Sequence, residues 1–108
     1  MAEVIVTEGF KRRYRSLAKK FRSLEEEILV LIGSLEQEPI HGTPLGQDCF
    51  KIRLSIKSKG GGKSGGGRVI TYVRLVKNKV YLLTIYDKSD KSTLSPKELR
   101  DLIASVGG

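Results

Sequence analysis

The stretch CFKIRLSIK at residues 49–57 alternates between apolar and polar side chains along its whole length. Period-two alternation is typical of a β-strand with one buried face, because successive side chains of a strand point to opposite sides of the sheet. The apolar set is Phe50, Ile52, Leu54 and Ile56, and the opposite set is Lys51, Arg53, Ser55 and Lys57. The pattern therefore predicts a strand with a buried face and a cationic face.

Further strands are expected on either side of this one. RVITYVRLV at 68–76 and VYLLTIY at 80–86 are rich in β-branched and aromatic residues, and a tight turn at 77–79 separates them. The last run is apolar on both faces, which favours a central place in the sheet. The short run EVIV at 3–6 predicts an edge strand, and HGTPLG at 41–46 is expected to be a loop.

Two amphipathic helices are predicted between the first strand and the rest of the sheet. The first spans about 8–21, where apolar side chains recur at helical spacing: Phe10, Tyr14, Leu17 and Phe21. Ser23 and Glu26 fit a capping box at the start of the second helix, which Pro39 ends. Since the link between the two helices is tight, we expect a helical hairpin.

A short helix is predicted at the C-terminal end of the sequence. Ser95 suits the N-cap position, Pro96 the first helical position, and Glu98 completes a capping box. The chain has 108 residues, which is enough for one domain with a modest core. We therefore expect a single domain, 1–108, of the α+β class.

Positive charge is concentrated in the middle of the chain. The formal net charge is +8, yet residues 51–91 hold eleven Lys and Arg against two acids, Asp87 and Asp90. A local excess of this size favours an anionic partner such as nucleic acid over the alternative of a solvated basic surface. No apolar run is long enough to span a membrane, and the single cysteine, Cys49, fits a reducing compartment. We expect a cytoplasmic protein without a membrane partner.

The glycine-rich stretch SKGGGKSGGGRVI at 58–70 resembles a nucleotide-binding loop only superficially. The phosphate loop G-x-x-x-x-G-K-[ST] would need glycine at the position of Lys57, and a strand rather than a helix is predicted to follow. A flexible hairpin loop is the plainer interpretation. Lys57, Lys59, Lys63 and Arg68 are spaced through it, so the loop is expected to rest against a nucleic-acid backbone.

The usual catalytic sets are missing from the sequence. One histidine and one cysteine are too few for a zinc site of ordinary composition, and we expect no metal and no other cofactor. An enzyme built from this chain would rely on Lys, Arg, Tyr and Ser. Such residues suffice to cleave RNA, because RNA carries its own nucleophile, the 2′-OH, and cations neutralise the charge that develops on the phosphate.

The order of predicted elements, together with KIR, the Gly/Lys loop, GGRVITY and YLLTIYDKSDKSTLS, resembles the RelE/ParE toxin superfamily, and most closely its HigB-type RelE-like branch. The resemblance implies an antiparallel twisted sheet with an N-terminal helical hairpin and a short C-terminal helix. It also implies a toxin of a type II toxin–antitoxin system that cleaves mRNA in the ribosomal decoding site without a metal, leaving a 2′,3′-cyclic phosphate or related end. The partner would be a cognate antitoxin, expected to be a helix-turn-helix protein.

The resemblance also assigns roles to individual residues. Lys51 and Arg53 would bind the scissile phosphate and help to activate the 2′-OH. Arg68 would stabilise the charge of the transition state. Lys91 stands where the RelE pattern has an arginine proposed as the general acid, which loses the planar fork of the guanidinium. Lys88 would be a nearby phosphate contact.

The tyrosine that RelE-type toxins carry after this segment is missing, and Ser95 stands in its place. Tyr72 or Tyr86 would stack on a base instead, or both belong to the core. Two other functions stay open at this point. One is a ParE-like inhibitor of DNA gyrase that cuts nothing, and the other is a non-toxic or inactive RNA-binding relic.

Overall fold

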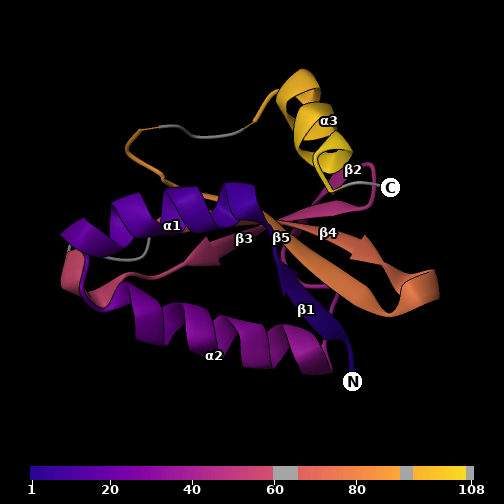
Figure 1. Cartoon of the computed structure of the whole chain (residues 1–108). Helices are drawn as coiled ribbons and strands as arrows, with labels where there is room; N and C mark the ends of the chain where they lie inside the picture. The colour runs from indigo at the N-terminus through magenta and orange to yellow at the C-terminus, as the bar shows by residue number, and fades with distance from the viewer. Residues whose placement is uncertain (60–65, 91–93, 107–108) are drawn as a thin grey trace.

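The structure is a computed structural model that describes residues 1–59, 66–90 and 94–106 (Figure 1). In chain order its elements are β1 (Glu3–Val6), α1 (Glu8–Lys20), α2 (Leu24–Gln37), β2 (Thr43–Gly46), β3 (Cys49–Leu54), the 3-10 turn η1 (Lys57–Lys59), β4 (Gly67–Arg74), the 3-10 turn η3 (Leu75–Lys77), β5 (Lys79–Asp87) and α3 (Pro96–Ala104). The predicted helices and long strands are confirmed to within a few residues, and the α+β class with them.

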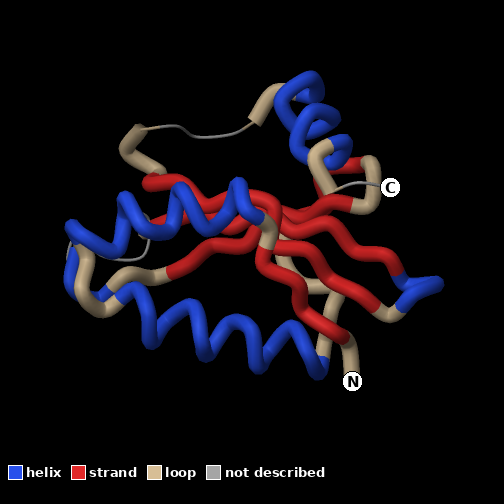
Figure 2. The backbone as a smooth tube through the Cα atoms, viewed as in Figure 1, coloured by secondary structure: helices blue, strands red, loops and turns tan. Residues whose placement is uncertain are grey.

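In the described ranges, one sheet of five strands runs in the order β1-β5-β4-β3-β2 (Figure 2). β5 is an interior strand, as its two apolar faces predicted, and it pairs antiparallel with β4. β1 lies at the edge as expected, but it runs parallel to β5, with Glu3 opposite Lys79. The predicted antiparallel sheet is therefore wrong for this one strand. Two helices separate β1 from the other strands, and a connection of that length permits the parallel pairing that a tight turn forbids.

The second edge of the sheet also differs from expectation. Residues 43–46, expected to belong to a loop, form β2, which pairs antiparallel with β3 and places Thr43 opposite Lys51. The register shifts between Pro44 and Gly46, where β2 is irregular. Proline is tolerated in this strand because an edge strand does not need every N–H for its ladder.

α1 is fastened to β5 at its first turn. The Oγ1 atom of Thr7 accepts a hydrogen bond from the Phe10 N–H at 3.2 Å, which caps the helix. The same hydroxyl donates to the carbonyl oxygen of Leu82 at 2.8 Å. One side chain therefore caps α1 and fixes where the helix leaves the sheet.

Of the two predicted capping boxes, one forms and one does not. Ser95 and Glu98 cap α3 reciprocally, with bonds of 3.1 and 2.9 Å. Within the described residues, Ser23 makes no capping bond to the first turn of α2, so the box with Glu26 is wrong. The Ser23 hydroxyl lies 2.8 Å from the hydroxyl of Ser58 and accepts the Ser58 N–H at 3.0 Å. A contact with a segment 35 residues further along the chain has replaced the local cap.

Helices cover both faces of the sheet. α1 and α2 pack on one face, whose core includes Phe10, Leu17, Leu24, Ile28, Leu31, Leu35, Ile52, Leu54, Val69, Val73, Val80, Leu82 and Ile85. α3 packs on the other face, where a smaller core joins Cys49, Ile70, Leu83, Tyr86 and Leu99. Figure 1 shows α3 apart from the α1–α2 pair. No helix in the described part of the chain is long and apolar enough to span a bilayer.

The glycine-rich stretch is described only at its two ends. β3 ends at Leu54, earlier than the predicted 57, and η1 is held against α2 because the Lys57 N–H donates to Glu27 Oε2 at 2.7 Å. Residues 60–65 lie outside the described ranges, so the prediction of a flexible loop there stays a prediction. β4 begins at Gly67, and a strand therefore follows the loop, as expected.

Candidate functional site

Three polar side chains form a row across the face of the sheet that carries α3. Arg53 on β3 is the register partner of Arg68 on β4, and Arg68 is the register partner of Tyr86 on β5. The neighbouring row on the same face consists of Lys51, Ile70 and Thr84. Strand alternation places the row on this face. Along each strand, the apolar residues next to Arg53, Arg68 or Tyr86 point to the opposite face, toward α1 and α2.

The two arginines of the row oppose each other at close range. The Val73 N–H donates to the Asp48 carbonyl, which makes that pair a hydrogen-bonded one. Hydrogen-bonded and non-hydrogen-bonded pairs alternate along an antiparallel ladder, and Arg53 and Arg68 lie an odd number of positions from this pair, so they form a non-hydrogen-bonded pair. In pairs of this type the opposite side chains approach most closely, with Cα atoms about 4.5 Å apart. Like charges placed directly opposite each other destabilise a sheet. A bound anion between them would remove this repulsion.

Arg68 is a buried cation. Only 4% of the surface of Arg68 is exposed to solvent. Its Nη1 donates a hydrogen bond to the Gly67 carbonyl at 3.0 Å. In the part of the chain that the structure describes, no carboxylate lies within ion-pair distance of its guanidinium. Buried charges are usually paired because leaving water is costly. The remaining guanidinium donors suit an anion that is not part of the protein.

Tyr86 completes the row beside Arg68 and is 8% exposed. Its hydroxyl is buried, and no hydrogen-bond partner for it exists among the described residues. Burial raises the pKa of the Tyr86 phenol above its ordinary value; Arg68 acts in the opposite direction, and Glu98 raises it further. The phenol therefore keeps its proton at neutral pH.

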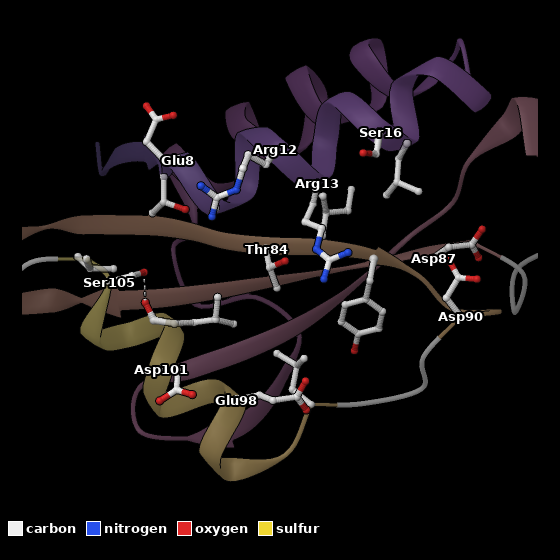
Figure 3. Close-up of a pocket in the computed structure, with 18 of the residues that line it drawn as sticks. Glu8, Arg12, Arg13, Ser16, Thr84, Asp87, Asp90, Glu98, Asp101 and Ser105 are labelled. Atoms are coloured by element: carbon white, nitrogen blue, oxygen red, sulfur yellow. Dashed lines mark hydrogen bonds between the residues drawn. The ribbon is translucent and has the colours of Figure 1, made fainter.

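A groove of about 990 Å³ opens beside Tyr86, between α1 and α3, along the part of β5 that lies beyond β1. Its two walls carry opposite charges. Figure 3 shows Arg12 and Arg13 extending from α1 toward β5, with Glu98 and Asp101 on α3 across from them. The groove runs along the edge of β5, and Tyr86 is one of the residues that line it.

The remaining predicted site residues fall into three groups. Lys51 is half-buried and Arg53 exposed on the face that holds the row, and Lys88 is half-buried just after β5. Lys57 is exposed in η1, where its N–H bonds to Glu27 of α2, and it is not part of the row. Lys63, Lys91 and the side chain of Lys59 lie outside the described residues.

Tyr72 does not join the row. It lies four residues along β4 from Arg68, where it packs against Tyr81 with ring centroids 6.0 Å apart. The guanidinium carbon of Arg74 sits 5.9 Å from the centre of the Tyr72 ring. Tyr72 is therefore remote from the paired arginines, and its predicted role in stacking on a base stays a prediction.

Sequence reasoning missed the approach of Glu98 to Tyr86 and the groove beside them. The capping box at Ser95 gave a sufficient local reason for Glu98, and no pattern in the sequence connected it to β5. The groove depends on where β1 stops pairing with β5, at Leu82, which the sequence does not indicate.

The Cys49 thiol is buried on the same face of the sheet. Burial, and to a smaller extent the Asp48 carboxylate, raises the pKa of this thiol to about 12. Within the described ranges, no three His, Cys, Asp or Glu side chains gather as a metal site.

Comparison with known proteins gives a consistent result. A family model described as the RelE toxin of the RelE/RelB toxin–antitoxin system matches residues 6–105. The chain is similar to a chain in the crystal structure of the intact E. coli RelBE toxin–antitoxin complex, with a TM-score of 0.60 and 18% identity, covering 79% of this chain and 94% of that chain. It is also similar to a mutant of the E. coli toxin RelE in the free state, with a TM-score of 0.53 and 21% identity, covering 85% of this chain and 90% of that one. At these identities the two structures establish a shared fold.

Proposed function

The chain belongs to the RelE toxin family of toxin–antitoxin systems, and we propose that it is a ribosome-dependent endoribonuclease that arrests translation by cleaving mRNA. The observation that carries the proposal is the pair formed by Arg53 and the buried Arg68, two cations in close opposition without a carboxylate between them among the described residues. A scissile phosphate would satisfy both guanidinium groups.

The proposed chemistry is an attack of the RNA 2′-oxygen on the adjacent phosphorus. The new O–P bond forms as the bond to the 5′-oxygen breaks, which gives a 2′,3′-cyclic phosphate and a free 5′-hydroxyl. Arg68 and Arg53 hold the non-bridging oxygens, where negative charge grows in the transition state. We propose that Lys51, one row along the same face, contacts the 2′-OH.

Proton transfers complete the reaction. The 2′-OH passes its proton to water as it attacks, and the leaving 5′-oxygen gains one. From the family resemblance we propose that Lys51 and Arg53 promote the first transfer and that Lys91 supplies the second proton. Lys88, Lys57, Lys59 and Lys63 are proposed as contacts to the RNA backbone, a role that the charge of this segment supports.

RNA reaches the row only if the segments packed on it shift, since Arg68 and Tyr86 are both more than nine-tenths buried. Leu99 of α3 packs in the same cluster as Tyr86, and among the residues of α3 it alone is fully buried. Leu102 and Ile103 of α3 add half-buried contacts to the same cluster, and a helix held by so few buried side chains moves away from a sheet at modest cost. We propose that α3 moves in this way when the toxin engages its substrate.

The proposed partners are the ribosome with its mRNA in the decoding site and a cognate antitoxin. The structural relative solved as a RelBE complex contains an antitoxin. For this chain we propose an antitoxin of the helix-turn-helix class, a cytoplasmic location, and the HigB-type branch, for which the Gly/Lys loop and the segment after β5 are the support.

Controlled expression in a bacterial host tests the proposal. Induction should stop protein synthesis within minutes, and primer extension should locate cuts only in messages that are being translated. DNA damage with intact mRNA would instead indicate a gyrase inhibitor, and the absence of both effects would indicate an inactive relic. Either of these two results contradicts the proposed ribonuclease.

A further inference from the structure

Tyr86 carries a hydroxyl group that makes no hydrogen bond to any residue the structure describes. The ring packs with Ile70, Leu83 and Leu99, and phenylalanine would fill the same space. The hydroxyl is buried, without a hydrogen-bond partner in the described part of the chain. Most buried polar side-chain atoms in proteins are hydrogen-bonded, because an unpartnered one costs stability. A tyrosine kept at such a position is expected to have a partner in another state of the protein.

The position of Tyr86 indicates what that partner is. Arg68 is its register neighbour on β4, and the two residues form a hydrogen-bonded pair, because the Lys88 N–H donates to the Gly66 carbonyl two positions along the same ladder. The two side chains therefore extend side by side from the same face of the sheet. The guanidinium group and the phenol hydroxyl are both donors. The Tyr86 hydroxyl, and the guanidinium N–H groups of Arg68 other than the one bonded to the Gly67 carbonyl, have no acceptor among the described residues, so together they form a site for an anionic oxygen.

We propose that the Tyr86 hydroxyl donates a hydrogen bond to the non-bridging phosphate oxygen that Arg68 binds, so that the two residues together stabilise the transition state of RNA cleavage. This inference rests on the proposed ribonuclease function. No proton is transferred to or from the phenol in this role. The hydroxyl remains a donor throughout, consistent with a phenol whose pKa is raised by burial.

This role differs from the two that the sequence suggested for a tyrosine. Base stacking would use the face of the Tyr86 ring, whereas the role proposed here uses its hydroxyl. The position of the RelE-type tyrosine is occupied by Ser95, whose hydroxyl already accepts the Glu98 N–H as the cap of α3. In the proposed role, the Tyr86 hydroxyl on β5 supplies a donor in place of the tyrosine that is missing at Ser95, in the segment after β5.

The test compares Tyr86→Phe with the wild-type protein in ribosome-dependent cleavage of a defined mRNA. We expect kcat to fall on the order of 100-fold, the usual effect of losing one donor to a developing oxyanion, while KM changes less than threefold. Tyr81→Phe is the matched control, because it removes the same atom from a tyrosine of the same strand that lies opposite Tyr72, away from Arg68; its kcat should stay within twofold of wild type.

Urea unfolding supplies the readout that separates this role from a structural one. Because no described residue is a partner of the hydroxyl, Tyr86→Phe should unfold at the same urea concentration as wild type or at a higher one. A lower midpoint would overturn the inference, since the hydroxyl would then stabilise the fold. Cleavage by Tyr86→Phe within twofold of wild type would overturn it as well. Absence of cleavage by the wild-type protein would instead overturn the ribonuclease function on which the inference rests.

Discussion

Replacing Arg68 by methionine should make the protein more stable and inactive at the same time. Methionine has a similar length and no charge, so the side chain still fills the space on the face of the sheet. The variant removes a cation that is 4% exposed and that faces Arg53 across the ladder. A residue that weakens the fold and is needed for activity is characteristic of a functional site.

The size of the effect follows from three contributions. Removing like charges from directly opposite positions gains a few tenths to about 1 kcal/mol. Replacing a buried, incompletely hydrogen-bonded polar group by an apolar one raises the free energy of unfolding by about 1–3 kcal/mol. Loss of the 3.0 Å bond from Arg68 to the Gly67 carbonyl costs about 1 kcal/mol, and Gly67 keeps its place in the ladder opposite Leu54. The net gain in the free energy of unfolding is about 1–2 kcal/mol.

Urea unfolding with and without sulfate measures this effect. Sulfate stands in for the phosphate, and an anion at ten times its Kd stabilises the folded state by about 1.4 kcal/mol. We expect this stabilisation in the wild-type protein and its loss in Arg68→Met. Arg15→Met, at an exposed position of α1, is the control and should change neither quantity by more than about 0.5 kcal/mol. If Arg68→Met is less stable than wild type by more than about 1 kcal/mol, Arg68 is a structural residue and the reasoning fails.

Three further predictions concern other parts of the chain. Gly66→Ala should lower the free energy of unfolding in urea by about 1–3 kcal/mol, because a Cβ there would overlap the backbone of β3. The control, Gly33→Ala on the open side of α2, should raise it by up to about 1 kcal/mol. Equal effects of the two variants would contradict this description of the packing at Gly66. Burial raises the pKa of Cys49 to about 12, so the thiol of the unfolded chain ionises first and the free energy of unfolding falls as the pH rises above about 9. The wild-type protein should lose up to about 1.4 kcal/mol per pH unit more than Cys49→Ala. Parallel pH profiles of the two proteins would contradict this. The double variant Lys51→Ala/Arg53→Ala should lose at least about 100-fold in mRNA cleavage while keeping the wild-type circular dichroism spectrum, and a folded variant with full activity would contradict the site.

The strands could be predicted where one face is buried. The alternation at 49–57 predicted which side chains of β3 face α1 and α2, because a shift of one residue would have moved every apolar side chain to the cationic face. β2 gave no such signal, since its residues are exposed apart from a half-buried Leu45. The direction of β1 could not be predicted either. An edge strand carries the same residues whether it runs parallel or antiparallel to its neighbour.

The site could be predicted as a set of residues but not as an arrangement. Charge and family resemblance indicated Lys51, Arg53 and Arg68, yet the opposition of the two arginines depends on a register set across the glycine-rich stretch. That the Tyr86 hydroxyl has no partner among the described residues depends on its neighbours in space and not on its neighbours in the sequence. Likewise, Ser23 had a good local reason to cap a helix, and a contact with η1 from far along the chain changed its role.

Cleavage of a defined mRNA by the purified toxin, with and without ribosomes, tests the central claim most directly. The proposal predicts that wild-type toxin cuts the message only when ribosomes are translating it, leaves a 2′,3′-cyclic phosphate, and loses the activity in the folded Arg68→Met variant. An intact message in the presence of translating ribosomes, or undiminished cleavage by folded Arg68→Met, would contradict it.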